Sequence, residues 1–315
     1  MDPTLLGLIL GILQGLFEWL PVSSEGQMVI FIVHFFGSNI DVATSLALFA
    51  HIGTAFVVIV YYREEFKNMV KTGLTYIGPK EMWDTKSDNF LLTRNLIIVT
   101  ICTVPTALPS LIIFEDIVNS LNQDLGVSVE SLITLLVGVL LLVTGLILYQ
   151  RRKTVNMEKY TETETYDPKK RFEDLSIKEL VILGLLQGFA ALPGISRSAI
   201  TITYLLLGTK SSQDESLRGS FIVAVPVSLG AGFLDVIRGK ILFEPSGLYY
   251  YNSNNILTPA ISYLGMFILV LTAFVVGFLT LRTFLDLAKK VDFDKFVIAF
   301  GLIAIGAVLF GIILG

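Results

Sequence analysis

The residues best suited to chemistry in this sequence lie in two polar segments that interrupt apolar stretches. The first segment, in a run otherwise hydrophobic enough for a membrane, holds Gln14, Glu18, Pro21, Ser23 and Ser24. Ionisable side chains are costly at bilayer depth, so by default they mark a functional site. Gln14 and Glu18 share one face of a helix, because they are four residues apart. Beyond Pro21, serine hydroxyls and unpaired backbone N–H groups can meet an anion at a helix start.

The second polar segment lies in the other half of the chain and reads Pro193-Gly194-Ile195-Ser196-Arg197-Ser198. Arg197 is always charged, and its planar guanidinium suits binding of phosphate oxygens through several hydrogen bonds. Together the two segments supply an anion pocket, a hydroxyl nucleophile and a carboxylate. That combination fits phosphoryl transfer, in which positioning and charge neutralisation do most of the work.

Simpler roles are open for many of these residues. Serines after a proline commonly cap helices, and we expect at least one of Ser23, Ser196 and Ser198 to be only a cap. Glu18 and Arg197 could form a buried ion pair that merely joins two segments, although a strut would not need a lining of serines and amides. Turn formation or close helix approach explains the glycines at least as well as ligand contact does, namely Gly15, Gly26, Gly188 and Gly194.

The composition indicates an integral membrane protein of the helical type. Of the 315 residues, 53% are hydrophobic and 16% are charged, and the mean hydropathy is +0.73. A soluble domain carries about 25% charged residues, and several apolar runs here approach the roughly 20 residues that span a bilayer. The net charge of −4 points to neither nucleic acid nor a polybasic surface. Cys102 is the one cysteine, which excludes a disulfide and a thiolate metal cluster within the chain.

The chain repeats its plan, which predicts two halves joined by a polar linker. Leu10–Gly15 align with Leu183–Gly188, and Leu20-Pro21 aligns with Leu192-Pro193. Each half is expected to hold a broken pair of short helices, which enters and leaves on one side of the membrane, and three full spans. The first repeat covers 1–150, with a re-entrant hairpin at about 5–36 and spans at about 42–62, 94–114 and 131–150. The linker covers 151–176, and the second repeat covers 177–315, with a hairpin at about 177–208 and spans at about 216–237, 258–284 and 293–314.

An odd number of crossings in each half requires the second repeat to be inverted relative to the first. Short interrupted helices at matching places in such halves point to a site near the midplane, where the two tips meet. Most basic residues, 20 of the 23, lie in segments that this plan places on one side, which are 62–95, 150–180, 209–219 and 282–295. The positive-inside rule makes that side cytoplasmic, and the predicted outer loops are 37–41, 115–130 and 238–257. The first hairpin therefore opens outside and the second in the cytosol, with both termini outside.

These residues resemble the motifs of a known family, the undecaprenyl-diphosphate phosphatases of the bacitracin-resistance type. The family's first motif, a glutamate or glutamine followed by a glutamate and serines, is matched by Gln14-x-x-x-Glu18 with Leu20-Pro21-Val22-Ser23-Ser24-x-Gly26. Its second motif is matched by Pro193-Gly194-Ile195-Ser196-Arg197-Ser198-Ala199-Ile200-Thr201. The resemblance covers nearly the whole chain, including repeat order and span number.

The resemblance implies an inverted-repeat fold and hydrolysis of a polyprenyl diphosphate to the monophosphate, which recycles a lipid carrier for envelope glycan synthesis. It also implies a multi-pass protein of the cell membrane with a site open to the outer face. By analogy Glu18, Ser24 and Arg197 are catalytic, with Ser24 as nucleophile and Arg197 on the diphosphate. Substrate binding is implied for Gln14, Ser23, Gln27, Gly194, Ser196, Ser198 and Thr201. A divalent cation such as Mg²⁺ would screen the diphosphate from Glu18.

One departure from the family motif concerns the proton chemistry. Many members carry Ser-x-Gly-His, whereas this chain has Ser24-Glu25-Gly26-Gln27. An amide cannot act as a general base, so the proton work must move to Glu18, Glu25 or His51. We prefer Glu18, because a desolvated carboxyl suits acid–base work, and Glu25 is an alternative base or metal ligand. A lone histidine in a span, such as His51, is otherwise more often a hydrogen-bonded structural residue.

The main rival function is transport. Paired hairpins in inverted repeats are the architecture of alternating-access carriers, and the same anion pocket could bind and release a polyprenyl phosphate without cleaving it. A purely structural membrane role is a third alternative, which fits poorly with polar residues clustered so tightly. The expected partners are a polyprenyl diphosphate and membrane lipids, with a homodimer as a further option and no nucleic acid.

Overall fold

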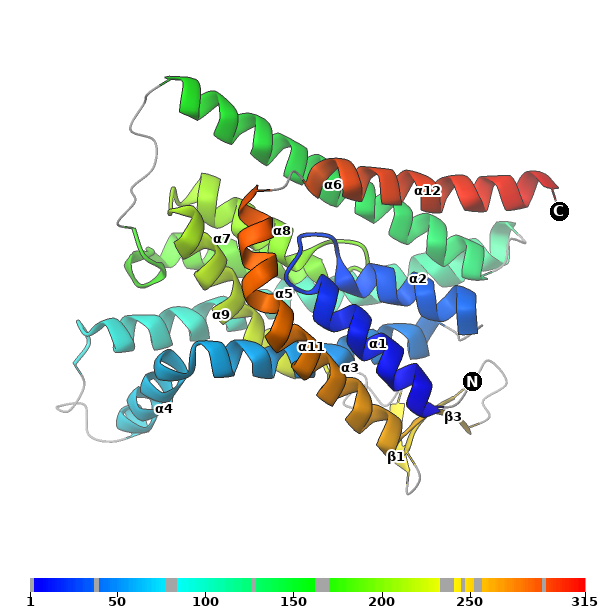
Figure 1. Cartoon of the computed structure of the whole chain (residues 1–315), viewed down its shortest axis with the longest axis horizontal. Coiled ribbons are helices and arrows are strands. Elements are labelled where there is room, and N and C mark those ends of the chain that lie inside the picture. The colour runs from blue at the N-terminus through cyan, green and yellow to red at the C-terminus, as the bar shows by residue number, and fades with distance from the viewer. Residues whose placement is uncertain are drawn as a thin grey trace.

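A computed structural model describes residues 3–36, 40–77, 84–125, 129–161, 170–232, 241–244, 247–251, 257–290 and 293–314. Helices form most of this part of the chain (Figure 1). The longer ones are α1 (Pro3–Phe17), α2 (Ser24–Phe36), α3 (Ile40–Tyr61), α4 (Arg63–Ile77), α5 (Asp88–Leu125), α6 (Val129–Thr161), α7 (Ile177–Gly188), α8 (Arg197–Thr203), α9 (Gln213–Ala231), α11 (Tyr263–Lys290) and α12 (Phe293–Leu314). Short helical turns are η2 (Phe172–Asp174), η3 (Phe189–Ala191) and the π-helical η4 (Tyr204–Gly208).

Four helices in the described ranges are long and apolar enough to cross a membrane, in agreement with the predicted class of helical membrane protein. These spans are Val42–Tyr61 of α3, Asp88–Phe114 of α5, Ser131–Thr154 of α6 and Tyr263–Asp286 of α11. Each overlaps one of the predicted spans. α12 fills the predicted range 293–314, whereas α9 ends at Ala231 rather than near 237.

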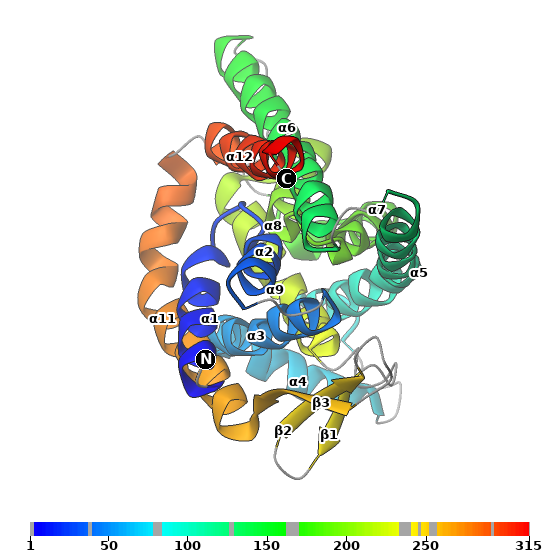
Figure 2. The same ribbon diagram turned by 90° about the vertical axis from the view of Figure 1, so that its right-hand side faces the viewer.

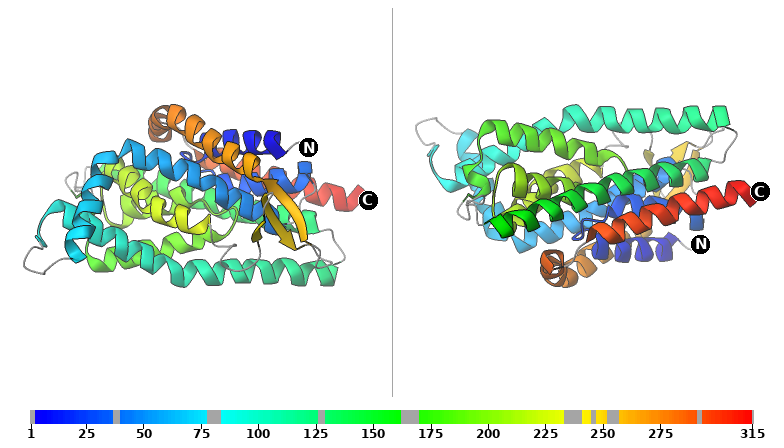
Figure 3. Two further views of the ribbon diagram at one scale, coloured as in Figure 1. Left: turned by 90° about the horizontal axis from the view of Figure 1, so that it is seen from below. Right: turned by 90° about the horizontal axis from the view of Figure 1, so that it is seen from above.

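Two broken pairs of helices point their tips toward the centre of the molecule from opposite ends (Figure 3). α1 and α2 are joined by a turn around Pro21, and α7 and α8 are joined by η3 and a turn that contains Gly194. The α1–α2 pair opens toward the end that carries both chain termini, and the α7–α8 pair opens toward the end that carries α4 (Figure 1). With 15 and 13 residues, α1 and α2 are each shorter than a bilayer crossing.

The first helix of each broken pair packs against a long helix of the other half of the sequence. α1 lies along α11, and α7 lies along α5 (Figure 2). Glycines permit both contacts: a Cβ on Gly11 would lie 2.6 Å from the Thr272 Cβ, and one on Gly184 would lie 2.6 Å from the Cys102 Cβ. Lipid tails are as apolar as the helices themselves, so close backbone approach supplies the packing energy between them. The glycine rows therefore determine which helices meet.

The segment before α7 connects α5 and α7 through charged contacts at the first residues of both helices. Arg171 binds both carboxylate oxygens of Asp88, at 2.7 and 2.9 Å. The Ser176 hydroxyl accepts from the Glu179 backbone N–H at 3.3 Å, and the Glu179 carboxylate accepts from the Ser176 N–H at 2.9 Å. Burial alone would raise the pKa of Glu179, but hydrogen bonds from Lys170 and Ser176 hold that pKa below its usual range. These contacts determine where α7 begins and hence where its other end lies.

A small antiparallel sheet lies beside the helices, in a segment predicted to be a loop. Strands β1 (Ile241–Glu244), β2 (Gly247–Tyr251) and β3 (Leu257–Ser262) pair in sequence order. The sequence predicts a loop at 238–257 and a span from 258, whereas α11 begins at Tyr263. The tyrosines at 249–251 favour a strand, but strands this short show too little alternation to be recognised. The sheet lies at the same end of the molecule as the N-terminus (Figure 1).

Two helices extend beyond the predicted spans into segments expected to be loop or linker. α5 continues to Leu125, into the predicted loop 115–130, and α6 continues to Thr161, into the predicted linker 151–176. Neither extension contains a glycine or proline, and Gly126 follows α5 directly. Hydropathy locates the membrane-crossing part of a helix, whereas the helix itself ends at a breaker or cap.

Gly11→Ala should destabilise the protein, whereas Gly306→Ala should not. A Cβ at Gly11 would lie 2.6 Å from the Thr272 Cβ and 2.7 Å from the Leu269 carbonyl oxygen, and overpacking of this kind costs about 1–3 kcal/mol. An added Cβ at Gly306 of α12 meets no atom within 4 Å, so that variant gains only helix propensity. The midpoint of thermal unfolding in detergent should fall for the first variant and hold or rise for the second. Equal midpoints would contradict close packing of α1 on α11.

Candidate active site

The turn between α1 and α2 forms the first tip of the site. The Glu18 N–H donates to the Gln14 carbonyl at 3.1 Å, so Glu18 extends the last turn of α1. Ser23 has a φ of 57°, in the left-handed region that few residues other than glycine adopt. Its hydroxyl accepts from the Gly26 N–H at 3.3 Å and caps α2. This turn places the next residue, Ser24, at the start of α2 and beside Glu18.

The turn before α8 forms the second tip. Gly194 has a φ of 106°, which glycine adopts without steric cost. The Thr144 hydroxyl of α6 donates to the Gly194 carbonyl at 2.9 Å and accepts from the Ser196 N–H at 3.0 Å. The Ser196 hydroxyl accepts from the Ala199 N–H at 3.2 Å and caps α8. A buried threonine on a neighbouring span therefore sets the shape of this tip.

The two tips touch through their backbones. A Cβ on Gly26 would lie 2.7 Å from the Gly194 nitrogen and 2.8 Å from its Cα. The Ser198 hydroxyl of the second tip donates to the Leu20 carbonyl of the first at 3.4 Å. The expectation that glycines here serve close approach is confirmed for Gly26. Absence of a side chain at this point brings the polar residues of both tips within reach of one another.

Glu18 joins the tips through its carboxylate. One oxygen, Oε1, pairs with Arg197 Nη2. The other, Oε2, accepts from Gln14 Nε2 at 2.9 Å and from the Ser24 hydroxyl at 2.9 Å, and it lies 3.3 Å from His51 Nε2. Glu18 is only 6% exposed. An ionised group removed from water needs such compensation, because an unpaired buried charge is very costly.

His51 of α3 faces hydrogen-bond acceptors at both ring nitrogens. Its Nδ1 lies 2.7 Å from the Ala47 carbonyl oxygen, and its Nε2 faces the Glu18 carboxylate. A carbonyl and an ionised carboxylate can only accept, so both contacts are hydrogen bonds when the ring carries two protons. The histidine is therefore placed to hold a proton beside Glu18. A purely structural histidine would need only the contact with the Ala47 carbonyl, whereas His51 also contacts a carboxylate that lines the cavity.

Arg197 is supported from α8 and α9 and keeps donors for a ligand. Its Nη1 donates to the Ser220 carbonyl at 3.2 Å, and its Nη2 donates to Glu18. The Thr201 hydroxyl donates to the Arg197 carbonyl at 2.9 Å and accepts from the Ser220 hydroxyl at 2.6 Å. A guanidinium has more N–H groups than these two contacts use, and the others suit phosphate oxygens.

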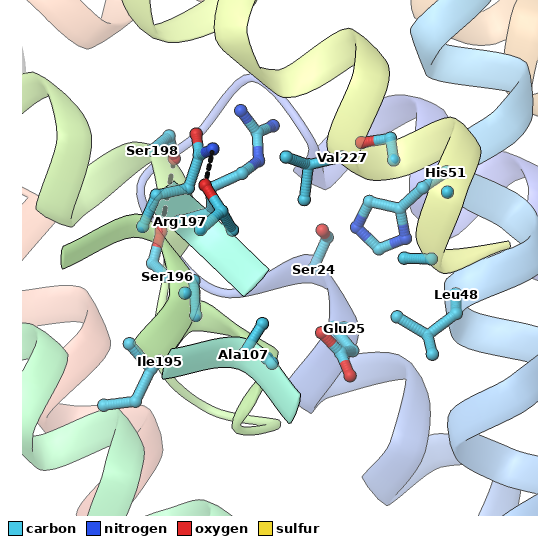
Figure 4. Close-up of a pocket in the computed structure, with 18 of the residues that line it drawn as sticks. Ser24, Glu25, Leu48, His51, Ala107, Ile195, Ser196, Arg197, Ser198 and Val227 are labelled. Atoms are coloured by element: carbon cyan, nitrogen blue, oxygen red, sulfur yellow. Dashed lines mark hydrogen bonds between the residues drawn. The ribbon is translucent and has the colours of Figure 1, made fainter. Parts of the chain in front are cut away.

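The reactive groups line a cavity of about 350 Å³ between the tips and helices α3, α5 and α9. In Figure 4, Ser196, Arg197 and Ser198 lie on one side, His51 lies on the other, and Ser24 lies between them. Most of the remaining wall is apolar, formed by Leu20, Leu48, Val104, Ala107, Leu108, Leu111, Ile195 and Val227. A chamber with one polar region and apolar walls suits an amphipathic ligand.

The predicted site residues divide into two groups. The cavity is lined by Glu18, Ser23, Ser24, Glu25, His51, Ser196, Arg197 and Ser198. Gln14, Gly194 and Thr201 lie behind that layer, where they contact Glu18, shape the second tip and support Arg197. Gln27 also lies outside the wall, because its amide donates to the Val22 carbonyl at 2.8 Å, within the first tip. The structure thus gives Gln27 a contact that stabilises the turn, and Gln27 is not among the residues that line the cavity.

Four further polar residues of the cavity lie outside the motifs. These are Thr100 and Thr103 of α5, Gln187 of α7 and Ser228 of α9. The Gln187 amide donates to the Thr103 hydroxyl at 3.0 Å. Alignment of the repeats pairs Gln187 with Gln14, which is the signal that could have identified it. Ser228 lies in no recognisable motif, so only the packing of α9 shows its place in the wall.

Comparison with known proteins finds relatives along nearly the whole chain. The family described as bacitracin resistance protein BacA matches residues 7–308. A protein of Methanothrix thermoacetophila named undecaprenyl-diphosphatase is 33% identical over 299 residues, which cover 95% of this chain and 94% of that protein. One of the same name from Saccharolobus islandicus is 36% identical over 76% of each chain. An undecaprenyl-diphosphatase 2 of Bacillus thuringiensis is 31% identical over 92% of this chain and 91% of its own.

The fold and the site define a helical membrane protein with an acid, hydroxyl and guanidinium centre between two interior turns. Within that class, this chain belongs to the bacitracin resistance protein BacA family. The match confirms the resemblance that the two polar motifs carry, and it extends over both halves of the sequence.

Replacing both Glu18 and Arg197 should destabilise the protein by much less than the sum of the single replacements. Glu18→Gln or Arg197→Gln alone leaves a buried charge without its partner, which typically costs about 3–5 kcal/mol. The double variant removes both charges of the pair. Unfolding free energies of the four proteins in one detergent measure the coupling. Additive costs would contradict a direct ion pair between the tips.

Proposed function

We propose that this protein hydrolyses a polyprenyl diphosphate to the monophosphate and inorganic phosphate, in line with the diphosphatase names of its relatives. The observation that carries the proposal is the Glu18 carboxylate, which holds the Ser24 hydroxyl and the Arg197 guanidinium at one cavity. A nucleophile, its base and a cation for phosphate thus share one centre, as phosphoryl transfer requires. None of the relatives described above is named as a transporter, so the rival function gains no support from them.

Ser24 is the nucleophile in this proposal. Its hydroxyl donates to Glu18 Oε2 at 2.9 Å, so the carboxylate can take the proton as Oγ attacks the terminal phosphorus. A bond forms between Oγ and that phosphorus, the bond from phosphorus to the bridging oxygen breaks, and the polyprenyl monophosphate leaves with the proton. Water then attacks the phosphoserine, and its proton passes through Glu18 to the serine oxygen. Inorganic phosphate is released, and Ser24 is restored.

The second tip binds the phosphate groups in this proposal. Arg197 presents its remaining N–H donors, and the hydroxyls of Ser196 and Ser198 lie in the same wall, 3.2 Å from one another. Hydrogen bonds from a guanidinium to phosphate oxygens are charge-assisted and become stronger as negative charge develops in the transition state. The guanidinium also pairs with Glu18, which keeps the carboxylate close to the reacting phosphate without leaving either charge unpaired.

His51 takes the place of the histidine that many members carry at the position of Gln27. The Gln27 amide is bound to the first tip, whereas His51 Nε2 lies 3.3 Å from the Glu18 carboxylate. A histidine beside the base can supply or withdraw a proton as Glu18 changes its protonation. The proton chemistry therefore uses a residue of α3 rather than one of α2.

A divalent cation would fit beside Glu25. Among the described residues, no cluster of three or more histidine, cysteine, aspartate or glutamate side chains could hold a metal alone. Mg²⁺ commonly uses one or two carboxylates together with substrate phosphates, and Glu25 lines the cavity at 8% exposure. Glu25 follows Ser24 in the first turn of α2 and lines the same cavity, so we assign this role to its carboxylate. When bound, the cation would neutralise charge on the diphosphate.

The apolar walls accommodate the polyprenyl chain in this proposal. Val104 and Leu108 of α5 line the cavity, and they are 49% and 39% exposed. An apolar residue exposed on a membrane span faces lipid tails. The wall formed by α5 is therefore continuous with the lipid-facing surface, and a long isoprenoid chain can extend from the cavity into the bilayer while its head group stays on the tips.

We further propose that residues 1–150 and 177–315 are inverted repeats, joined by the polar segment 151–176, and that each begins with a re-entrant hairpin. The exchange of partners supports this plan, because α1 packs on α11 while α7 packs on α5. The opposite directions of the two broken pairs support it as well (Figure 3). With the basic residues concentrated at one end, the protein would lie in the cell membrane with its termini outside. The site would then open to the outer face and recycle the carrier lipid of envelope glycan synthesis.

Cysteine labelling tests this orientation. Lys86 and Ser120 are exposed residues near opposite ends of α5, so they should lie on opposite sides of the membrane. In a Cys102→Ala background, a membrane-impermeant maleimide applied to intact cells should label Ser120→Cys and spare Lys86→Cys. Permeabilised cells should allow labelling of both. Labelling of Lys86→Cys alone in intact cells would reverse the proposed orientation.

Purified protein should release inorganic phosphate from a polyprenyl diphosphate in detergent. Ser24→Ala should lower kcat by at least about a hundredfold, because it removes the nucleophile, and Arg197→Ala should abolish release above background. Ser216→Ala is the matched control, since this buried serine of α9 does not line the cavity. Full turnover by Ser24→Ala would remove the nucleophile. Lipid transport without phosphate release by the wild type would favour the rival function.

The same assay separates the supporting roles. Glu18→Gln should lose activity, and retained turnover would exclude Glu18 from the mechanism. His51→Gln should lower kcat and change its dependence on pH, because the partner of the base no longer titrates. Glu25→Gln should raise the Mg²⁺ concentration needed for half-maximal rate, if that carboxylate holds the cation, and an unchanged Mg²⁺ dependence would exclude it.

A further inference from the structure

Ser228 lines the cavity with a hydroxyl for which the described residues provide no hydrogen-bond partner. It lies in the last turn of α9, which ends at Ala231, and it is 6% exposed. Hydroxyls on these helices often donate to the carbonyl four residues earlier, as Thr103 does to Val99 at 2.8 Å. A buried hydroxyl without such a bond carries a free-energy cost unless water or a ligand meets it.

A second serine of the same helix shows what distinguishes Ser228. Ser216 also lacks a hydrogen-bond partner for its hydroxyl among the described residues, but it is completely enclosed at 0% exposure and does not line the cavity. The Ser228 oxygen is not enclosed in this way and can be met from the cavity. Of the two serines, only Ser228 can therefore serve a ligand.

Ser228 lies on α9, a part of the cavity wall that belongs to neither tip. Figure 4 shows Val227, the preceding residue of α9, close to Ser24, with Arg197 on one side and His51 on the other. Pro226 also lines the cavity, and a proline inside a helix removes a backbone hydrogen bond and bends the helix at that point. α9 thus adds a hydroxyl to the cavity that also holds the nucleophile and the donors of the second tip.

We propose that Ser228 binds the second phosphate of the diphosphate, so that α9 selects a diphosphate over a monophosphate. The inference rests on the proposed function, since it assigns one phosphate to Arg197 and the other to Ser228 of α9. A serine hydroxyl donates one hydrogen bond to a phosphate oxygen without adding charge. A monophosphate whose phosphate is held by Arg197 has no second phosphate to accept that bond. The substrate is then retained more firmly than the product that must leave.

Kinetics of Ser228→Ala test this assignment. KM for a short-chain polyprenyl diphosphate should rise about tenfold, the loss expected for one hydrogen bond to a charged group, while kcat stays within about twofold. Inhibition by the monophosphate product should not change. Ser228→Thr keeps the hydroxyl and should preserve KM, and Ser216→Ala should match the wild type. An unchanged KM for Ser228→Ala, or an equal loss of product inhibition, would overturn the proposal.

A second measurement does not depend on turnover. In a Cys102→Ala background, inorganic pyrophosphate should slow the reaction of Ser228→Cys with a small thiol reagent several-fold, whereas inorganic phosphate should have little effect. Equal protection by both anions, or protection by neither, would also contradict the assignment. Should the wild type release no phosphate from its substrate, the proposed function fails, and protection by pyrophosphate still decides whether Ser228 contacts a diphosphate.

Discussion

Compensation of one buried carboxylate is the interaction on which the rest of this structure depends. Glu18 is contacted by Gln14 of α1, Ser24 of α2, His51 of α3 and Arg197 of α8. A charge in an apolar interior persists only where donors and opposite charge surround it. Those partners come from both halves of the chain. The contacts that compensate the Glu18 charge therefore also bring the polar residues of the site together.

Close backbone approach makes that compensation possible. The turns that carry Glu18 and Arg197 meet at Gly26 and Gly194, where a side chain on Gly26 would collide with the opposite backbone. Irregular backbone inside a membrane also needs its own hydrogen bonds, because no lipid can supply them. Ser23 and Ser196 cap the helices that leave the two turns, and Thr144 binds the second turn on both sides. These small residues and hydroxyls therefore stabilise the two tips, whether or not they also contact a substrate.

Much of the site could be predicted because some residue types have few other uses at bilayer depth. An acid and a guanidinium in apolar segments need either a partner of opposite charge or a ligand, and Glu18 and Arg197 pair with each other. Gln27 was assigned to the substrate from its place in a motif, but its amide reaches the Val22 carbonyl. α5 and α6 continue beyond the predicted spans, because hydropathy marks the apolar part of a helix while helix ends follow breakers and caps. The strands at 241–262 were missed because each is too short for a periodic signal.

The sequence by itself determined that this is a helical membrane protein in which two polar segments interrupt apolar stretches. Composition, run length and motif spacing are local properties, and each can be read without knowing what lies across the molecule. Only the tertiary structure decided that His51 of α3 and Ser228 of α9 share a cavity with Ser24, and that Gln27 does not. Contacts between distant parts of the chain follow from the angles and distances at which helices pack, and no pattern within one helix contains them.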